Sequence, residues 1–176
     1  MSSKNVKLTI KSKSSLVVNE CQTCGFKKLK PILFIGYLPP VNEYILNGTT
    51  PAEQPSYPAQ LLFCDNCKLV QLGLIVDPTI LFPKEYPYTS STTKVLRDNF
   101  KQLSEECSTL IPLDKKDLVI DIGSNDGNLL NNFKDNHRVL GVTPEEIGKI
   151  AIKNGIPTIL EYFSADTCSE ILKKYG

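Results

Sequence analysis

The stretch from Asp117 to Leu130, DLVIDIGSNDGNLL, decides the fold of this 176-residue chain. Leu118 to Ile122 is a short apolar run rich in β-branched residues, which predicts a buried parallel strand. Gly123 and Gly127 bracket a tight polar turn, after which apolar residues resume at helical spacing. A strand, a glycine turn and a helix in this order are typical of an α/β sheet that binds a ligand at the carboxyl end of a strand.

The turn is rich in side-chain acceptors, which are Asp121, Ser124, Asn125 and Asp126. A phosphate-binding loop would need backbone N–H groups and a cation, with no acids crowding the phosphate. The acids therefore favour a ligand that is cationic or rich in hydroxyl and amine donors. S-adenosylmethionine, which carries an ammonium, a sulfonium and ribose hydroxyls, fits this description.

Alternating elements are predicted after the turn. The pattern indicates a helix to about Phe133, a strand at 138–142, a helix from Thr143 to Gly155, a strand at 157–160 and a helix from about Asp166. Thr143 is the expected N-cap of its helix, with Pro144 at the first helical position and Glu146 at the third. Such a β-α-β-α-β-α series predicts a parallel sheet with right-handed crossovers.

The region before Asp117 has a different pattern. Six prolines between 31 and 58 exclude long helices there and favour short strands and turns. Residues 61–72 indicate a strand into a knuckle and a strand out of it, and Val6–Ile10 and Leu16–Val18 are candidate edge strands. A proline-stiffened connector at 77–91 precedes a helix over about 91–109. The apolar face of that helix is formed by Leu96, Phe100, Leu103 and Cys107.

Four cysteines form two Cys-x-x-Cys pairs, Cys21 with Cys24 and Cys64 with Cys67. Two such pairs are typical of a tetrahedral thiolate zinc site. Four protein ligands leave no open coordination position, so the zinc would be structural and would stabilise a segment of roughly 80 residues with few large apolar clusters. A redox Cys-x-x-Cys pair and an iron site are the alternatives.

Composition excludes several classes of partner. The 20 basic and 19 acidic side chains give a net charge of +1, which provides no electrostatic case for nucleic acid or an anionic membrane. No apolar run approaches the roughly 18 residues of a spanning helix, and no secretory h-region follows Met1. We therefore expect a cytoplasmic protein with reduced or metal-bound cysteines. The single histidine, His137, is expected to be a surface turn residue.

Three motifs occur in a fixed order: the cysteine pairs, the segment YPYTSS at 86–91 and the segment DIGSNDG at 121–127. Together they resemble the N-terminal part of the S-adenosylmethionine-dependent sugar C-methyltransferases. The resemblance covers nearly the whole chain from Cys21 onward. It implies an N-terminal zinc-binding domain and a class I methyltransferase domain, followed by a further C-terminal domain. It also implies methylation of a carbon in nucleotide-linked keto-deoxysugars.

The resemblance also implies roles for individual residues. The backbone at Gly123, Ser124, Asn125 and Gly127 would approach the methionine part of the cofactor. Asp121 and Asp126 would hold its ammonium, directly or through water. Tyr88 and Ser90, and more weakly Tyr86, would lie near the cofactor from the connector. Wedge packing between domains is the alternative for the tyrosines, and Asp121 has the alternative role of stabilising the turn.

Two features depart from the family pattern. The acid that usually takes the ribose hydroxyls at the end of the second strand is replaced by Thr143, with Glu145 as the nearest substitute. Only three strands are predicted after Asp117, whereas the class I sheet has about seven, and the family's catalytic histidine motif would lie beyond Gly176. We therefore expect a fragment that binds cofactor at best weakly and has no turnover alone. No catalytic residue is predicted within it.

The expected architecture is α/β. A small zinc-binding β-rich domain at 1–80 is followed by a connector and helix at 81–115 and by part of a Rossmann-like methyltransferase sheet at 116–176. The expected partner is a nucleotide-linked sugar, with no nucleic acid and no membrane. The alternative is a stand-alone zinc-ribbon recruitment module with a nucleotide-cofactor-binding half-domain, for which Lys27, Lys28 and Lys30 are the nearest basic group. A nicotinamide oxidoreductase would need Gly-x-Gly-x-x-Gly, which is absent at 123–127.

Overall fold

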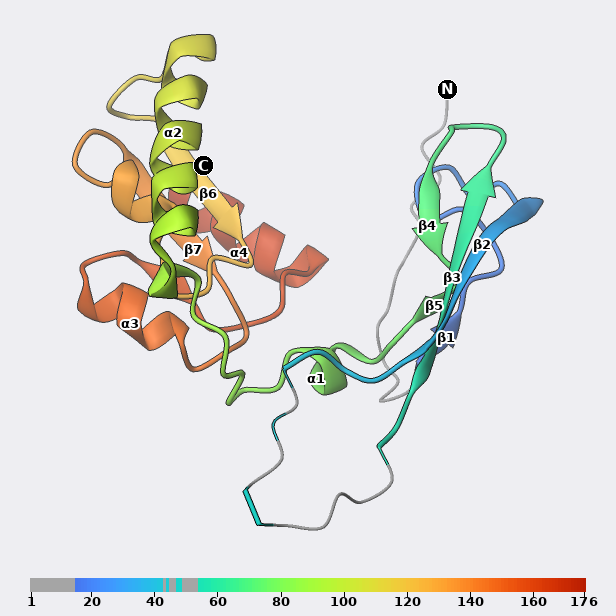
Figure 1. The fold of residues 1–176 in the computed structure, drawn as a ribbon. Helices are drawn as coiled ribbons and strands as arrows, with labels where there is room; N and C mark the ends of the chain where they lie inside the picture. Colours follow the sequence, from blue (N-terminus) through green and yellow to red (C-terminus); the bar gives the residue numbers. More distant parts are fainter. Residues whose placement is uncertain (1–14, 43, 45–46, 49–53) are drawn as a thin grey trace. The chain divides into compact units, whose positions relative to one another are not determined.

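The computed structural model describes residues 15–42, 44, 47–48 and 54–176. The chain divides into two compact units, which comprise residues 1–81 and 82–176 (Figure 1). The candidate strand at Val6–Ile10 lies outside the described residues. Among the described residues, no helix combines the length and the hydropathy that crossing a bilayer requires.

The first unit is built from antiparallel strands. Its main sheet has the order β2-β3-β4, and a two-stranded sheet pairs β1 with β5. The elements are β1 (Leu16–Val17), β2 (Leu29–Leu38), β3 (Tyr57–Cys64), β4 (Val70–Leu72), β5 (Leu74–Ile75) and α1 (Pro78–Leu81). The predicted strand, knuckle and strand at 61–72 correspond to β3 and β4.

Strand β2 is longer than the proline content suggested. It accommodates Pro31 because it lies at the edge of its sheet, where a missing N–H removes little. The pairing with β3 shifts between Pro31 and Leu33 and again between Phe34 and Gly36. The first irregularity lets the strand include Pro31, and Gly36, with φ +132°, adopts the backbone conformation that the second shift requires.

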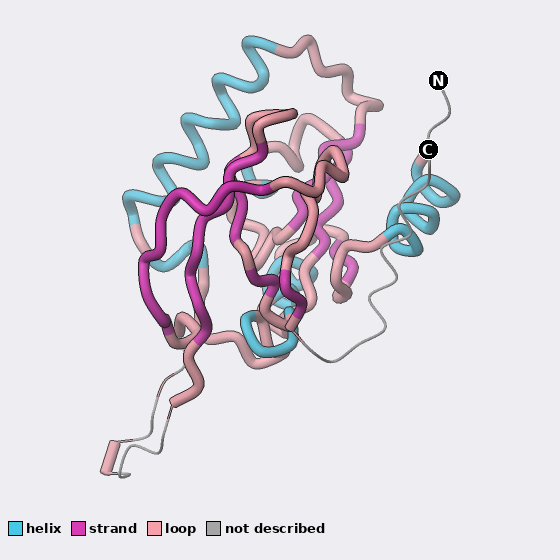
Figure 2. The backbone as a smooth tube through the Cα atoms, turned by 90° about the vertical axis from the view of Figure 1, so that its right-hand side faces the viewer, coloured by secondary structure: helices cyan, strands magenta, loops and turns pink. Residues whose placement is uncertain are grey.

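The second unit has a parallel sheet in the order β6-β7-β8. Figure 2 shows the strands in magenta and the helices in cyan. The elements are η1 (Ser90–Thr92), α2 (Lys94–Leu110), β6 (Leu118–Ile122), η2 (Leu130–Asn132), β7 (Arg138–Val142), α3 (Gly148–Lys153), β8 (Thr158–Ile159) and α4 (Ala165–Tyr175). The predicted α/β class is confirmed.

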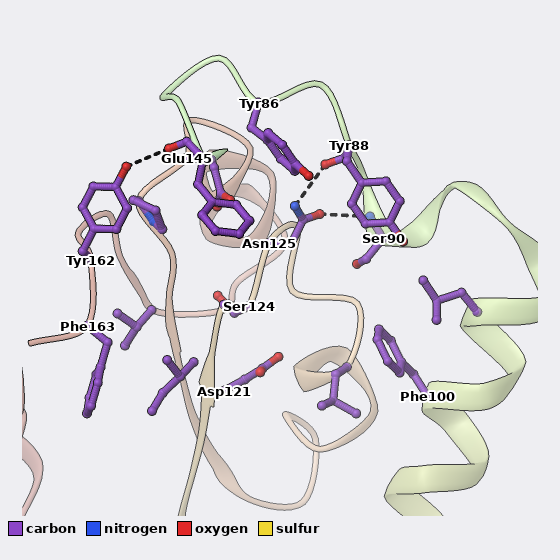
Figure 3. Close-up of a pocket in the computed structure, with 17 residues that line it drawn as sticks. Tyr86, Tyr88, Ser90, Phe100, Asp121, Ser124, Asn125, Glu145, Tyr162 and Phe163 are labelled. Carbon is purple, nitrogen blue, oxygen red and sulfur yellow. Dashed lines mark hydrogen bonds between the residues drawn. The ribbon is translucent and has the colours of Figure 1, made fainter. Parts of the chain in front are cut away.

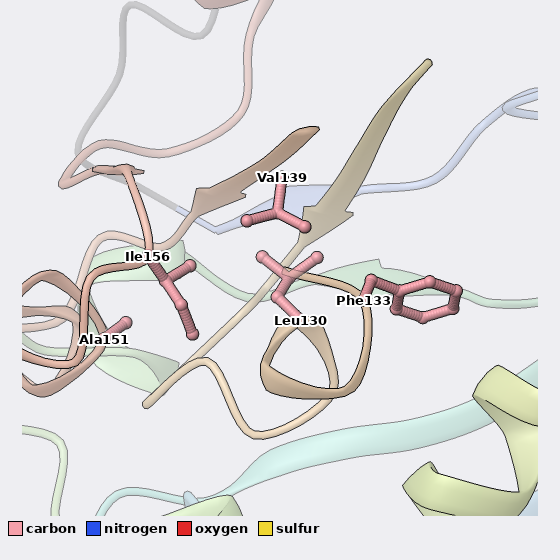
Figure 4. Close-up of a cluster of buried hydrophobic side chains, with 5 residues drawn as sticks. All are labelled: Leu130, Phe133, Val139, Ala151 and Ile156. Carbon is pink, nitrogen blue, oxygen red and sulfur yellow. The ribbon is translucent and has the colours of Figure 1, made fainter. Parts of the chain in front are cut away.

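Two apolar clusters cover opposite faces of this sheet, because successive side chains of a strand point to opposite faces. One face carries the buried side chains of Leu130, Phe133, Val139, Ala151 and Ile156 (Figure 4). On the other face, Ile171 of α4 packs against Leu140 and Val142 of β7. The central strand β7 is therefore buried on both sides.

The prediction that the 118–122 strand is buried was wrong. Ile120 is 42% exposed and Ile122 is 57% exposed. The reason is that β6 lies at an edge of the described sheet, and the α4 cluster reaches Leu118 but not the two isoleucines. An apolar, β-branched run thus marks the strand correctly without showing how much of it is covered.

Two helix predictions were also wrong. The helix expected up to Phe133 is only the short 3₁₀ turn η2, where the Asn132 amide group bonds to the carbonyls of Asn128 and Leu129. Such side-chain bonds compete with helical hydrogen bonding. Helix α3 begins at Gly148, not after Thr143, because the Thr143 hydroxyl donates to the Glu145 carboxylate instead of capping a helix.

The end of one helix at Gly155 and the start of the last helix at about Asp166 were predicted closely. Gly155 has φ +80° and follows α3, as expected for a residue that stops a helix. Helix α4 begins at Ala165, where the Ser164 side chain accepts a hydrogen bond from the amide of Thr167. Thr93 caps α2 by accepting from the amide of Leu96.

Replacing Gly127 with alanine should destabilise the second unit by about 3 kcal/mol. A Cβ at Gly127 would lie 2.8 Å from Ala151 and from Ile156, and the residue has φ +78°. Gly155→Ala is the matched control, because its φ is +80° but no atom lies within 4 Å of the position that the alanine methyl would occupy. We expect the control to lower the free energy of unfolding, measured with urea, by about 1 kcal/mol. Equal losses for the two variants would contradict the steric explanation.

Candidate functional site

The two cysteine pairs meet in the first unit. The sulfur atoms of Cys21, Cys24, Cys64 and Cys67 all lie within 4.8 Å of one another. Cys21 Sγ is 3.4 Å from Cys67 Sγ, and Cys24 Sγ is 3.6 Å from Cys64 Sγ. In a tetrahedral site with Zn–S bonds of about 2.3 Å, the sulfurs are about 3.8 Å apart. The cluster therefore has the size and the ligand type of a four-thiolate zinc site.

The two knuckles have the same backbone structure. In each, the residue after the second cysteine donates its amide to the carbonyl of the first, from Gly25 to Cys21 and from Lys68 to Cys64, both at 2.9 Å. Gly25 has φ +71° and Lys68 has φ +66°. A glycine in the first knuckle is readable from the sequence, whereas a lysine in this conformation gives no sequence signal.

The clustered cysteines take the place of a conventional apolar core. The buried apolar side chains of the first unit, among its described residues, are Cys21, Leu62 and Cys64. Hydrogen bonds, first from the Asn66 side chain and then from the Phe26 backbone and the neighbouring cysteines, lower the pKa of the Cys24 thiol to about 6, whereas the other sulfurs of the cluster raise the pKa of Cys67. Because metal binding requires thiolates, binding of zinc would release the protons that remain on the cluster.

A cavity of about 680 Å³ lies in the second unit, at the carboxyl ends of β6 and β7 (Figure 3). This volume is within the range of roughly 300–1,000 Å³ that is usual for small-molecule sites. Six predicted cofactor-binding residues line it: Tyr88, Ser90, Asp121, Gly123, Ser124 and Asn125. Tyr86 lines it as well. The other two predicted residues, Asp126 and Gly127, are not among the lining residues.

The pocket combines aromatic rings with acids. Its rings come from Phe82, Tyr86, Tyr88, Phe100, Tyr162 and Phe163, and its acids are Asp121 and Glu145. No lysine, arginine or histidine occurs among the lining residues. Burial raises the pKa of the Asp121 carboxyl. Such a lining disfavours a phosphate and suits a ligand that brings its own positive charge.

The ends of the second and third strands contribute as well. Glu145, at 6% exposure, lines the cavity and accepts a hydrogen bond from the Thr143 hydroxyl. Tyr162 and Phe163 follow β8 and line the cavity, although the sequence analysis did not single them out. The rule that ligands bind at the carboxyl ends of parallel strands could have found them. Phe100 was predicted only as part of an apolar helix face.

One fully buried polar atom beside the pocket has no hydrogen-bond partner among the described residues. Ser124 is 3% exposed, and its Oγ is the buried side-chain oxygen that lacks a hydrogen-bond partner within the described part of the chain. Gly141 lies close beneath it, because a Cβ at that glycine would be 2.5 Å from the oxygen. An unpartnered buried hydroxyl is unfavourable, and because this oxygen is fully buried against Gly141, a ligand in the cavity would reach it only after a local shift of the turn.

Comparison with known proteins agrees with a zinc-binding role for the cysteine cluster. Residues 21–82, which include all four clustered cysteines, match a family described as "Putative zinc binding domain". The chain is also 27% identical over 161 residues to the C-methyltransferase NovU of Streptomyces niveus. The resemblance to C-methyltransferases is confirmed. The match covers 90% of this chain and 38% of NovU, so the chain spans well under half the length of this relative.

We expect the purified chain to hold about one zinc ion, and Cys64→Ser to lose it on dialysis against a chelator. Cys64 is fully buried within the cluster, so its replacement removes a ligand that no neighbour can supply. Cys168→Ser is the matched control, since Cys168 lies outside the cluster in α4. Elemental analysis measures both. A wild-type chain without zinc, or equal zinc loss in both variants, would contradict the assignment.

Proposed function

We propose that this chain is the zinc-binding and cofactor-binding part of an S-adenosylmethionine-dependent C-methyltransferase that acts on a nucleotide-linked keto-deoxysugar. The observation that carries the proposal is the pocket at the carboxyl edge of the parallel sheet, which has acids and aromatic rings but no cationic side chain. The similarity to NovU, a C-methyltransferase, supports the reaction class. The sugar substrate is supported by the family resemblance of the motifs.

The residues of the pocket suit the parts of this cofactor. Asp121 offers a carboxylate for the ammonium. Glu145 offers one for the ribose hydroxyls, because Thr143 occupies the position where the family usually has an acid. The aromatic rings suit the adenine and, through cation–π attraction, the sulfonium. When bound, S-adenosylmethionine supplies an electrophilic methyl group to the substrate carbon.

This chain's own contribution is to bind and orient the cofactor. Methylation next to a ketone also needs a base that removes the α-proton. Both carboxylates that line the pocket are assigned to the cofactor, so among the described residues we assign none as this base. We therefore expect the isolated chain to bind S-adenosylmethionine without methylating a keto-sugar nucleotide. The proposed compartment is the cytoplasm, where thiols remain available to zinc.

Calorimetric titration should detect binding of S-adenosylmethionine and no binding of NADH. Asp121→Asn should weaken the affinity by about tenfold, because it removes a charge-assisted contact to the ammonium. Asp135→Asn makes the same chemical change at an exposed residue outside the pocket and should leave the affinity unchanged. Binding of NADH in place of S-adenosylmethionine would overturn the proposed function.

The raised pKa of Asp121 gives this residue opposite effects on binding and on stability. The carboxylate attracts the ammonium only when ionised, so affinity should fall as the pH is lowered through the raised pKa. Without ligand, ionisation of the buried carboxyl opposes folding, so stability falls as the pH rises through the same range. Asp121→Asn should therefore raise the unfolding midpoint of the free chain at neutral pH, and its affinity should no longer fall as the pH is lowered through the raised pKa of Asp121.

Titrations and thermal unfolding between about pH 4.5 and pH 8 measure both effects. Asp135→Asn again serves as the control and should change neither profile. A pH-independent wild-type affinity would show that Asp121 does not hold the charged group. A destabilised Asp121→Asn variant at neutral pH would show that the acid stabilises the turn instead.

A further inference from the structure

The C-terminal part of the predicted connector, residues 82–91, forms one wall of the pocket and is called the connector from here on. Phe82, Tyr86, Tyr88 and Ser90 line the cavity from this segment (Figure 3). All ten residues are described, and they contain no strand and only the start of the short helix η1. The path of the connector is therefore set by its bonds to the rest of the second unit.

Two adjacent residues of the glycine turn hold the C-terminal end of the connector. Asn125 Oδ1 accepts from the amide of Ser90 at 2.9 Å, and Asn125 Nδ2 donates to the carbonyl oxygen of Tyr88 at 3.0 Å. The Asp126 carboxylate accepts from Ser90 Oγ at 2.5 Å and from the amide of Ser91 at 3.1 Å. Asn125 is 8% exposed and Asp126 is 4% exposed. Hydrogen bonds in such buried surroundings are strong.

The N-terminal end of the connector is held by the two neighbouring strand ends. The amide of Glu146, after β7, donates to the carbonyl of Lys84 at 2.8 Å. The hydroxyl of Tyr162, after β8, donates to the carbonyl of Phe82 at 2.7 Å. Three consecutive strand ends thus anchor the connector over the edge where ligands bind. Of the hydrogen bonds that hold the connector, those to Asp126 are accepted by a carboxylate.

We propose that Asn125 and Asp126 are positioning residues, which act on the ligand through the connector. Both polar atoms of the Asn125 amide are bonded to the connector backbone, and Asp126 is not among the lining residues. By fixing the connector, they hold Tyr86 and Tyr88 as a preformed wall, so that ligand binding does not have to order this segment. The inference rests on the proposed function of the pocket as a site for S-adenosylmethionine.

The bonds themselves are tested by amide hydrogen exchange of the 176-residue chain, which needs no ligand. In the wild type, the amides of Ser90 and Ser91 should exchange at least about tenfold more slowly than that of Glu85, which is exposed in the same connector. Asn125→Gly, which tolerates the φ of +49° at this position, should accelerate exchange at Ser90 by about tenfold. Asp126→Ala should do the same at Ser91.

The effect on the ligand is tested by titrating the same variants with S-adenosylmethionine. Asn125→Gly and Asp126→Ala should each weaken the affinity by about tenfold. The conservative variant Asp126→Asn keeps an oxygen acceptor, so both its exchange rates and its affinity should be intermediate. Asp121→Asn is the matched comparison, because it should weaken the affinity and leave exchange at Ser90 and Ser91 unchanged.

These outcomes separate the alternatives. Faster exchange with unchanged affinity would overturn the positioning role, and weaker affinity without faster exchange would show direct ligand contact and overturn it as well. If either truncating variant fails to fold, Asp126→Asn carries the comparison. A wild-type chain with protected amides at Ser90 and Ser91 that does not bind S-adenosylmethionine would overturn the proposed function, and the positioning role with it.

Discussion

The second unit depends on the left-handed turn between β6 and η2. Gly123, Asn125 and Gly127 all have positive φ, which bends the chain sharply over the end of the sheet. The amides of Gly123 and Ser124 donate to the carbonyl of Val142 at 2.8 and 3.2 Å, so the turn is fastened to the end of β7. The same turn presents Asp126 to the connector. A single turn therefore joins two strands and the segment that closes the pocket.

The elements that could be predicted from the sequence are those with local causes. The bounds of β6 and β7 follow from short apolar runs that end at turn residues, and the cluster of four cysteines follows from their spacing alone. The start of α3 was not predicted, because the amide of Glu146, which Thr143 was expected to cap, bonds to the distant residue Lys84, and the Thr143 hydroxyl donates to Glu145 instead. The exposure of Ile120 could not be predicted either, since coverage depends on which helices reach the strand.

The features of the candidate site also fall into those that the sequence predicted and those that it did not. The chemistry of the pocket, with acids and no cation, was readable from residue types near one strand end. The partners of those residues were not, because Asn125 meets Ser90 across 35 positions and no local pattern marks the pairing. The contribution of Tyr162 was missed although the strand at 157–160 was predicted, because no local pattern shows that a ring three positions beyond the end of β8 lines the pocket.

The left-handed turn also bears on how variation among related sequences would be interpreted. Positive φ excludes β-branched residues and favours glycine, with asparagine next. Gly123 has open space where a Cβ would stand, so backbone conformation alone restricts it, whereas Gly127 is restricted by its neighbours as well. An unchanging glycine at either position would therefore reflect the geometry of the chain, and its invariance by itself would not be evidence of contact with a cofactor.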